Sequence, residues 1–168
     1  MWALAGLLCL SCLGVAAATF PDNVVLKDLN GNTVDFASFR GKYVYVDIWA
    51  SWCQPCREEI PHLQALEKSL GRKDVTFVSI SVDQNTAAWQ KAAKELNLEG
   101  NQLNDSQGTV CRALNVRYIP RFMLVDPEGN IINDNAPRPS SVEEVKEMFA
   151  NCKVVKVKKK RMRPAAQE

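Results

Sequence analysis

Ligands for a metal ion are scarce in this 168-residue sequence. It has one histidine, His62, and after residue 18 only Cys53 and Cys56 among the cysteines lie near one another. A structural zinc site needs four such ligands, and haem attachment to a C-x-x-C pair needs a histidine directly after the second cysteine, where this chain has Arg57. A glycine-rich phosphate-binding loop is also missing. We therefore expect no metal, haem, nucleotide or flavin cofactor.

An excess of one charge is lacking as well. The net charge is +2, and seven of the 21 basic residues but only one of the 19 acidic residues lie after Cys152, so residues 1–152 carry a net charge of −4. Binding to nucleic acid would therefore depend on residues 153–168 alone, and we expect no such partner. We predict that this basic segment is a disordered tail in contact with solvent, with anionic lipid or with a client.

Cysteines are too few for a fold held together by disulfides, since only four follow residue 18. The composition, with 46% hydrophobic and 24% charged residues, is that of a soluble globular protein. A chain of this length can bury one proper hydrophobic core. We therefore expect a single domain at residues 19–152, without internal repeats.

The first 18 residues differ from the rest of the chain. They are uncharged, rich in leucine and alanine, and end in Ala16-Ala17-Ala18. This pattern predicts a signal peptide at residues 1–18 and export to the periplasm or cell envelope. No lysine or arginine precedes the apolar run, so an uncleaved membrane anchor and a lipidated Cys12 remain alternatives.

Patterns after residue 20 predict alternating strands and helices. Asn30-Gly31 between two apolar segments indicates a β-hairpin. Residues 43–50 and 75–82 are nearly continuous apolar runs of strand length. Helical spacing of apolar residues predicts helices over residues 54–70, ended by Gly71, and over residues 86–96. The order strand, helix, strand, helix implies a parallel core in an α/β fold.

The second half of the sequence is expected to form shorter strands and helices. We expect a short strand and a short helix within residues 98–115. Residues 121–125 and 131–132, separated by Asp-Pro-Glu-Gly, indicate an antiparallel hairpin. A last helix is predicted to begin with a capping box at Ser141 and Glu144.

The cysteine pair lies where a buried strand is expected to turn into a helix. Cys53 would begin the helix, where unpaired N–H groups and the helix dipole favour a negative charge. Only a thiolate attacks a disulfide, and lowering a thiol pKa from about 8.5 to about 7 takes roughly 2 kcal/mol. Pro55 fits the first helical turn. This context favours dithiol redox chemistry for Cys53 and Cys56.

The segment VDIWASWCQPC at residues 46–56, with Pro61 and later Ile119-Pro120, resembles the thioredoxin superfamily. The chain is most similar to the TlpA/ResA-like thiol-disulfide oxidoreductases of the cell envelope, over about residues 20–150. The resemblance implies a thioredoxin-like fold: a central mixed β-sheet flanked by helices, with an added N-terminal β-hairpin and a central αβ insert after the second core strand.

The resemblance also assigns roles at the catalytic centre. Cys53 corresponds to the nucleophile and Cys56 to the resolving thiol. Asp47 corresponds to a buried acid that moves protons for Cys56, and burial should raise its pKa. Glu59 matches an active-site glutamate of the ResA-like branch. The alternatives are a core carboxylate for Asp47 and an exposed helix glutamate for Glu59.

Residues that bind the client follow from the same resemblance. Pro120 corresponds to a cis-proline that faces the dithiol, with Ile119 before it. Trp52, Gln54 and Pro55 surround the cysteines and complete the expected client-binding surface. Trp49 is expected in the core.

The chain departs from thioredoxin at Ser79, where thioredoxin has a lysine near the buried aspartate. Cys111 and Cys152 lie outside the motif, and we interpret each as incidental rather than as part of a second redox pair. His62 is interpreted as a surface or packing residue.

These features predict a monomeric enzyme that reduces disulfides in envelope client proteins. Ile119 and Trp52 resemble the reducing members, which receive electrons from a membrane-embedded dithiol donor, and apocytochrome c is the client typical of the family. Two alternatives remain: a peroxidase of the peroxiredoxin type, which should have threonine where this chain has Ala50, and a non-catalytic adaptor.

Overall fold

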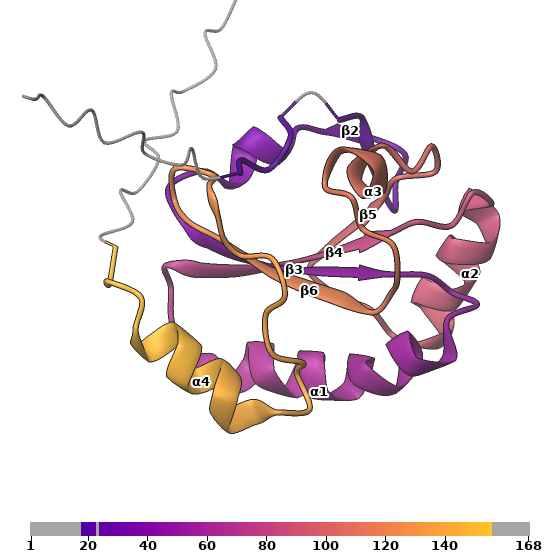
Figure 1. The fold of residues 1–168 in the computed structure, drawn as a ribbon. Coiled ribbons are helices and arrows are strands. Elements are labelled where there is room, and N and C mark those ends of the chain that lie inside the picture. Colours follow the sequence, from indigo (N-terminus) through magenta and orange to yellow (C-terminus); the bar gives the residue numbers. More distant parts are fainter. Residues whose placement is uncertain (1–17, 23, 156–168) are drawn as a thin grey trace, which may run out of the picture.

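The computed structural model describes residues 18–22 and 24–155 as a sheet of seven strands covered by helices (Figure 1). The predicted signal peptide, the alternative lipidation at Cys12 and most of the predicted basic tail lie outside the described residues. The strands are β1 Leu26–Asp28, β2 Thr33–Val34, β3 Tyr43–Trp49, β4 Val75–Ser81, β5 Asn101–Asn104, β6 Arg121–Val125 and β7 Ile131–Asn133. The helices are η1 Phe36–Phe39, α1 Gln54–Leu70, α2 Thr86–Glu95, α3 Thr109–Ala113 and α4 Val142–Ala150.

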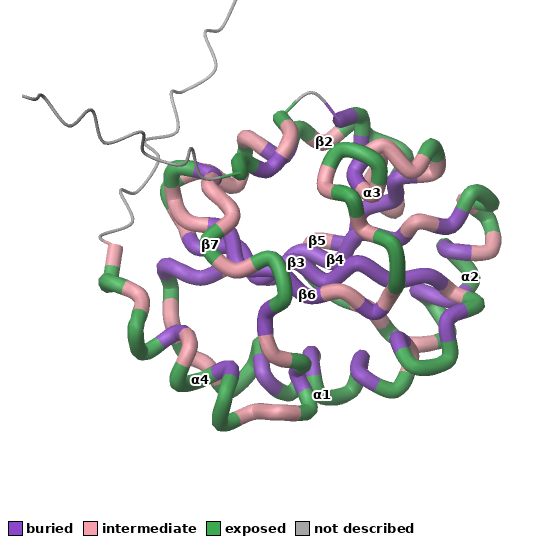
Figure 2. The backbone as a smooth tube through the Cα atoms, viewed as in Figure 1, coloured by how far each residue is buried: buried purple, intermediate pink, exposed green. Residues whose placement is uncertain are grey.

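The strand β3 lies in the middle of the molecule. The order across the sheet is β2-β1-β5-β4-β3-β6-β7, with β3 parallel to β4 and antiparallel to β6. All seven residues of β3 are buried, and its neighbours are also mainly buried (Figure 2). Both faces of the strand are covered because its side chains alternate between two parts of the core. This confirms the predicted mixed sheet with a parallel core.

Helices cover both faces of the sheet. In Figure 1, α1 and α4 pack below it, while η1 and α3 lie above it. Val44, Val46 and Ile48 of β3 contribute to the core on the upper side. Tyr43 and Tyr45 pack on the lower side with apolar residues of α1 and α4. The strand therefore connects the two halves of the core.

The added elements extend one edge of the sheet. After β4, the helix α2 leads to β5, which pairs in parallel with β4. The hairpin of β1 and β2 then pairs with the outer side of β5 through β1. Gly31 in its turn has a φ of +83°, which a residue with a side chain rarely adopts. The predicted N-terminal hairpin and αβ insert are thus both present and in contact.

The helix α1 begins and ends as its sequence predicts. Gly71 closes it in the left-handed conformation, with a φ of 64°. The helix continues through Pro61, which has no N–H to donate to the preceding turn. Within the described residues, no helix is sufficiently long and apolar to cross a membrane.

The predicted capping box of the last helix is wrong. Ser141 is the N-cap of α4, but its side chain makes no capping hydrogen bond. Its backbone has a ψ of 60°, whereas an N-cap serine that bonds to the helix is usually extended. The neighbouring Ser140 instead bonds through its backbone N–H and its hydroxyl to Glu59 of α1. A tertiary contact therefore determines the conformation at this helix start.

Candidate active site

The junction of β3 and α1 holds a disulfide. The sulfur atoms of Cys53 and Cys56 are 2.06 Å apart and the two Cα atoms 5.3 Å apart. Cys53 is the N-cap of α1, and its Sγ accepts a hydrogen bond of 3.3 Å from the backbone N–H of Cys56. Pro55 occupies the first turn of the helix, as predicted. When the pair is reduced, the same N–H and the helix dipole stabilise a thiolate on Cys53.

The residues around the disulfide differ in exposure. Cys53 and Cys56 are both buried, with 5% and 2% of their surfaces exposed. Trp52 is 69% exposed, and Gln54 and Pro55 are exposed beside it. The three residues predicted to bind a client are therefore accessible, while the disulfide itself is screened from solvent.

The peptide bond between Ile119 and Pro120 is cis, as predicted. Pro120 is buried, and Ile119 packs against the apolar cluster that contains both cysteines. The preceding residue, Tyr118, is 63% exposed. Arg121 fixes it by donating a hydrogen bond of 2.6 Å to its hydroxyl and by lying 5.2 Å from the centre of its ring. Tyr118 is a candidate client contact that the sequence did not indicate.

Asp47 lies in the buried part of β3, 4% exposed, and its partner in the register of β4 is Ser79. Burial raises the pKa of Asp47 to about 7, the hydrogen bond from Ser79 opposes this change, and the negative charge of Glu59 adds to it. An uncharged serine is therefore the neighbour of Asp47 on β4. A carboxyl group with this pKa can accept and return a proton near neutral pH.

Glu59 lies on α1 one turn after Cys56 and is 8% exposed, so the alternative of an exposed helix glutamate does not hold. Its Oε1 accepts a hydrogen bond of 2.9 Å from the Ser140 hydroxyl, and its Oε2 accepts one of 3.0 Å from the Ser140 backbone. Arg138 forms an ion pair with it at 3.7 Å. Glu59 therefore connects α1 to the segment before α4. Its negative charge also raises the pKa of Asp47.

One buried carboxylate near the site was not predicted. Asp83 follows β4, is 3% exposed, and accepts hydrogen bonds of 2.8 Å and 2.7 Å from the backbone and hydroxyl of Ser51. It also accepts one of 2.7 Å from the hydroxyl of Ser81. Asp83 thereby holds the turn that carries Trp52 and Cys53. Asp83 and Ser51 are 32 positions apart in the sequence, and no local pattern indicates their contact.

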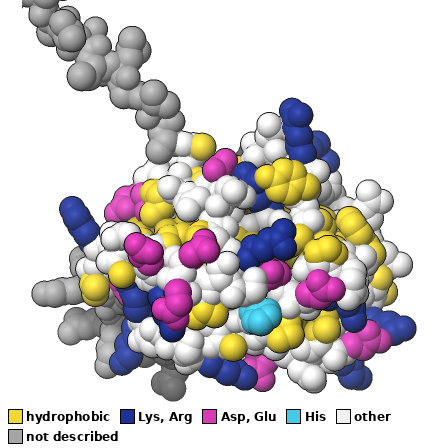
Figure 3. All heavy atoms as spheres, turned by 60° about the horizontal axis from the view of Figure 1, so that its bottom comes forward, with side chains coloured by type: hydrophobic (Ala, Val, Ile, Leu, Met, Phe, Trp, Pro, Cys, Tyr) yellow, Lys and Arg dark blue, Asp and Glu magenta, His cyan; other side chains and the backbone are white. Residues whose placement is uncertain are grey.

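The remaining candidate residues do not join this site. Cys111 and Cys152 are half-buried free thiols, not bonded to each other, and burial raises the pKa of both. His62 is exposed on α1. Among residues 18–22 and 24–155 no group of three or more histidine, cysteine, aspartate or glutamate side chains could hold a metal ion. Acidic and basic side chains are interspersed over the face shown in Figure 3.

Comparisons with known proteins agree with this site. The family model described as Redoxin matches residues 16–150. The thiol-disulfide oxidoreductase ResA of Bacillus thuringiensis is 28% identical over 112 residues, which are 67% of this chain and 65% of that protein. The match thus spans slightly less than two thirds of this curated relative.

Two solved structures have the same fold. The thioredoxin domain of a thiol-disulfide oxidoreductase from Bacteroides vulgatus is 32% identical, with a TM-score of 0.68 over 80% of this chain and 99% of that chain. A thiol:disulfide interchange protein from Bacteroides sp. is 30% identical, with a TM-score of 0.70 over 82% of this chain and 91% of that chain. Because the family model covers most of the chain and these structures share its architecture, the protein is a member of the Redoxin family with a thioredoxin-like fold.

Proposed function

We propose that this protein is a thiol-disulfide oxidoreductase that reduces disulfides in client proteins of the cell envelope. The observation that carries the proposal is the disulfide between Cys53 and Cys56 at the start of α1, in one apolar cluster with Ile119. The similarity to thiol-disulfide oxidoreductases supports it.

The reaction consists of two exchanges of disulfide bonds. The thiolate of Cys53 attacks a client disulfide, forms a mixed disulfide and releases one client sulfur as a thiolate. Cys56 then loses its proton to the carboxylate of Asp47, and its sulfur attacks Sγ of Cys53. This closes the disulfide of the enzyme and releases the second client sulfur. Two electrons pass to the client, and the raised pKa of Asp47 suits it to accept the proton.

The client binds as an extended segment beside Pro120, where the adjoining backbone offers hydrogen bonds. Trp52, Gln54 and Pro55 contact it from the side of α1, and their exposure leaves them accessible. Ile119 contributes from the other side. Glu59 supports the site by its charge and by holding α1 in place.

The location follows from the N-terminal sequence. Residues 1–18 direct the chain to the periplasm or envelope, where the protein acts as a monomer. An oxidising compartment does not regenerate the thiols, so a membrane-embedded dithiol donor supplies the electrons. Apocytochrome c, whose haem-binding cysteines must stay reduced, is the proposed client.

A peroxidase and a non-catalytic adaptor fit the site less well. Ala50 stands where a peroxiredoxin has threonine, and the pair closes as a disulfide within one helical turn. An adaptor needs neither the dithiol nor a buried carboxyl group such as that of Asp47.

The test is the reduction potential of the Cys53–Cys56 pair. The full chain is equilibrated in glutathione or dithiothreitol buffers, Trp52 fluorescence is followed, and Cys53→Ser serves as the control. A potential near or below about −220 mV is expected for a reductant. A value near about −120 mV would make the protein an oxidant, and the absence of a reversible two-electron couple would refute the redox function.

A further inference from the structure

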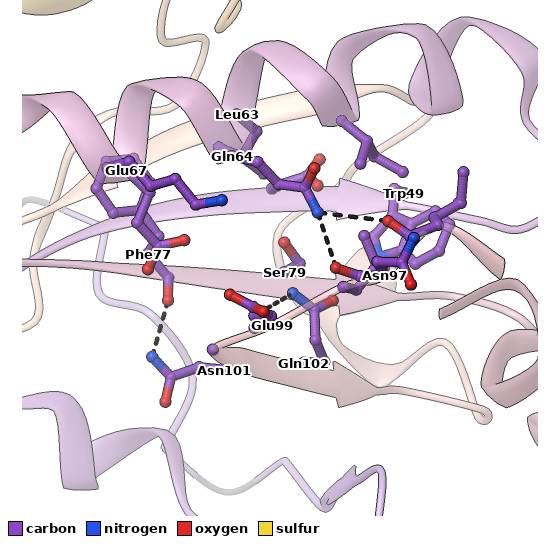
Figure 4. A pocket seen from close by; sticks show the side chains of 16 residues that line it. Trp49, Leu63, Gln64, Glu67, Phe77, Ser79, Asn97, Glu99, Asn101 and Gln102 are labelled. Carbon is purple, nitrogen blue, oxygen red and sulfur yellow. Dashed lines mark hydrogen bonds between the residues drawn. The ribbon is translucent and has the colours of Figure 1, made fainter. Parts of the chain in front are cut away.

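A cavity of about 340 Å³ lies between α1 and the strands β4 and β5 (Figure 4). Asp47 and Trp49 line its inner part, and α1 covers it with Leu63 and Gln64. Residues 96–102, which form the end of the αβ insert, make its outer wall. The cavity therefore connects the insert with the buried carboxyl group of the proposed mechanism.

A row of polar residues crosses the sheet at the floor of this cavity. The register pairs Asp47 of β3 with Ser79 of β4, and Ser79 with Gln102 of β5. Residues paired in this way point to the same face of a sheet, and neighbouring strands are about 4.8 Å apart. The row thus extends about 10 Å from Asp47 towards the insert.

Two buried polar atoms at this cavity have no hydrogen-bond partner in the described part of the protein. They are Nε1 of Trp49 and Oε1 of Gln102, on side chains that are 0% and 9% exposed. Gln102 is held in place because its Nε2 donates a hydrogen bond of 2.9 Å to the backbone of Glu99. Buried polar atoms are nearly always paired with protein or with water, and a polar cavity of this size has room for several water molecules.

Glu67 and Gly100 both line the cavity and are exposed, so the cavity reaches the surface beside them. A Cβ placed on Gly100 would lie 3.5 Å from Oε1 of Glu67, so the carboxylate covers this glycine. Gln64 holds α1 and the insert together at the cavity, because it donates a hydrogen bond of 3.0 Å to the backbone of Asn97. Glu67 is three turns after Cys56, or about 16 Å along the helix.

We propose that this cavity is the route by which Asp47 exchanges protons with solvent, with Gln102 as a positioning residue that orders the water along it. The proposal rests on the proposed role of Asp47 in the reduction of clients. Because its mouth is remote from the dithiol, the route stays open while a client covers Trp52 and Pro120. The insert thus contributes directly to the reaction.

Cys56 gives its proton to the carboxylate of Asp47, and its sulfur keeps the electron pair that forms the bond to Cys53. The protonated Asp47 then releases that proton through the water of the cavity. One proton reaches solvent for each enzyme disulfide formed. The titratable and polar groups facing Asp47 are Tyr45 of β3, Glu59 of α1 and Ser79 of β4.

The test uses the reduced full chain and the aromatic disulfide 5,5′-dithiobis(2-nitrobenzoate). Attack by Cys53 releases a first coloured thiolate at a rate that rises with reagent concentration. Attack by Cys56 on the mixed disulfide releases a second one in a step independent of that concentration, so excess reagent separates the two phases. Stopped-flow traces are recorded as a function of pH.

Gln102→Met keeps the length of the side chain but removes its polar atoms. We expect it to slow the second phase and to move its pH midpoint upwards by about one unit, because less water then stabilises the charged Asp47. The first phase should be unchanged. Gln64→Met, which removes polar atoms from the opposite wall, should act in the same direction.

Gln90→Met is the matched control. Gln90 also donates one side-chain hydrogen bond to a backbone oxygen, that of Leu29, but lies outside the cavity. The second phase of Gln102→Met and Gln64→Met is compared with that of Gln90→Met. If its rate and its pH midpoint are the same in all three variants, the proposed route is overturned. Failure of the unsubstituted protein to release the second thiolate would instead refute the dithiol function.

Discussion

At the scale of single residues, Asp47 shows how burial determines chemistry. Its position in an apolar strand is visible in the sequence, and the expectation of a raised pKa agrees with the structure. The sequence did not indicate the burial of Glu59 or the contacts of Asp83. Glu59 depends on Ser140 and Asp83 on Ser51, and each partner is more than 30 residues away. Local sequence patterns contain no information about such contacts.

Asp47→Asn should make the folded protein more stable, increasingly so at higher pH. The folded pKa of about 7 lies above 3.8, the ordinary pKa of an aspartate in the unfolded chain, so the native state loses stability as pH rises between these values. The advantage of the variant in free energy of unfolding should grow by about 1.4 kcal/mol per pH unit between about 4 and 7, and then level off. Urea unfolding at several pH values measures it.

Asp134→Asn, which also removes a carboxylate, is the control, since this side chain is 77% exposed. An equal pH dependence in both variants would contradict the assignment. Asp47→Asn should also slow the release of the second thiolate in the two-phase assay, because asparagine cannot accept the proton of Cys56.

At the scale of elements, strands and helices with strong patterns agree with the sequence. The strand β3, the helix α1 and the N-terminal hairpin all lie where apolar spacing, Gly71 and Asn30-Gly31 indicate. The start of α4 was predicted with the wrong hydrogen bonds, because the contact of Ser140 with Glu59 replaces the local capping box. Helix ends that take part in tertiary contacts are therefore the weakest part of such predictions.

The turns after β3 and β4 are joined by Asp83, and its removal should loosen the turn before Cys53. We expect Asp83→Ala to cost about 1–3 kcal/mol of stability, because it leaves the backbone N–H and hydroxyl of Ser51 without their acceptor. Urea unfolding of the oxidised protein measures this loss. The reduced variant should also react with iodoacetamide at Cys53 at an altered rate.

Ser51→Ala provides the comparison, since it removes only the hydroxyl bond and keeps the bond from the Ser51 backbone to Asp83. Its loss of stability should be smaller than that of Asp83→Ala. Equal losses would show that the backbone bond contributes nothing to the turn.

At the scale of the whole molecule, the order of the strands was only partly predictable. The alternation of strands and helices indicates a parallel core, and the structure has it. That β5 lies between β4 and the N-terminal hairpin depends on pairing between segments about 75 residues apart, such as Lys27 with Asn104. The polar row from Asp47 to Gln102 results from the pairing of β3 with β4 and of β4 with β5, whose register no local sequence pattern indicates.

The C-terminal end of the domain is held by Asp74. It accepts hydrogen bonds of 3.0 Å and 2.7 Å from Arg72 and one of 2.8 Å from the backbone of Val155, while Arg72 also donates to the backbone of Phe149 at the end of α4. The hydrogen bonds from Arg72 lower the pKa of Asp74 to about 2.

This pKa predicts a pH-dependent loss of stability. The folded pKa lies below 3.8, the ordinary pKa of an aspartate in the unfolded chain, so the stabilisation is complete above that pH and disappears as pH falls towards 2. Asp74→Asn should therefore cost about 2 kcal/mol at pH 7 and much less near pH 2. Urea unfolding at both pH values checks this, and an equal loss at both would contradict it.

The position of β5 has a consequence for the ancestry of the domain. Among the strands of the described residues, the hairpin of β1 and β2 pairs with the rest of the sheet through β5, which belongs to the insert. A shorter relative without α2 and β5 would have to dock its hairpin on β4 with a new register, or lose it. Hairpin and insert are therefore expected to be gained and lost together in evolution, as one inheritable unit.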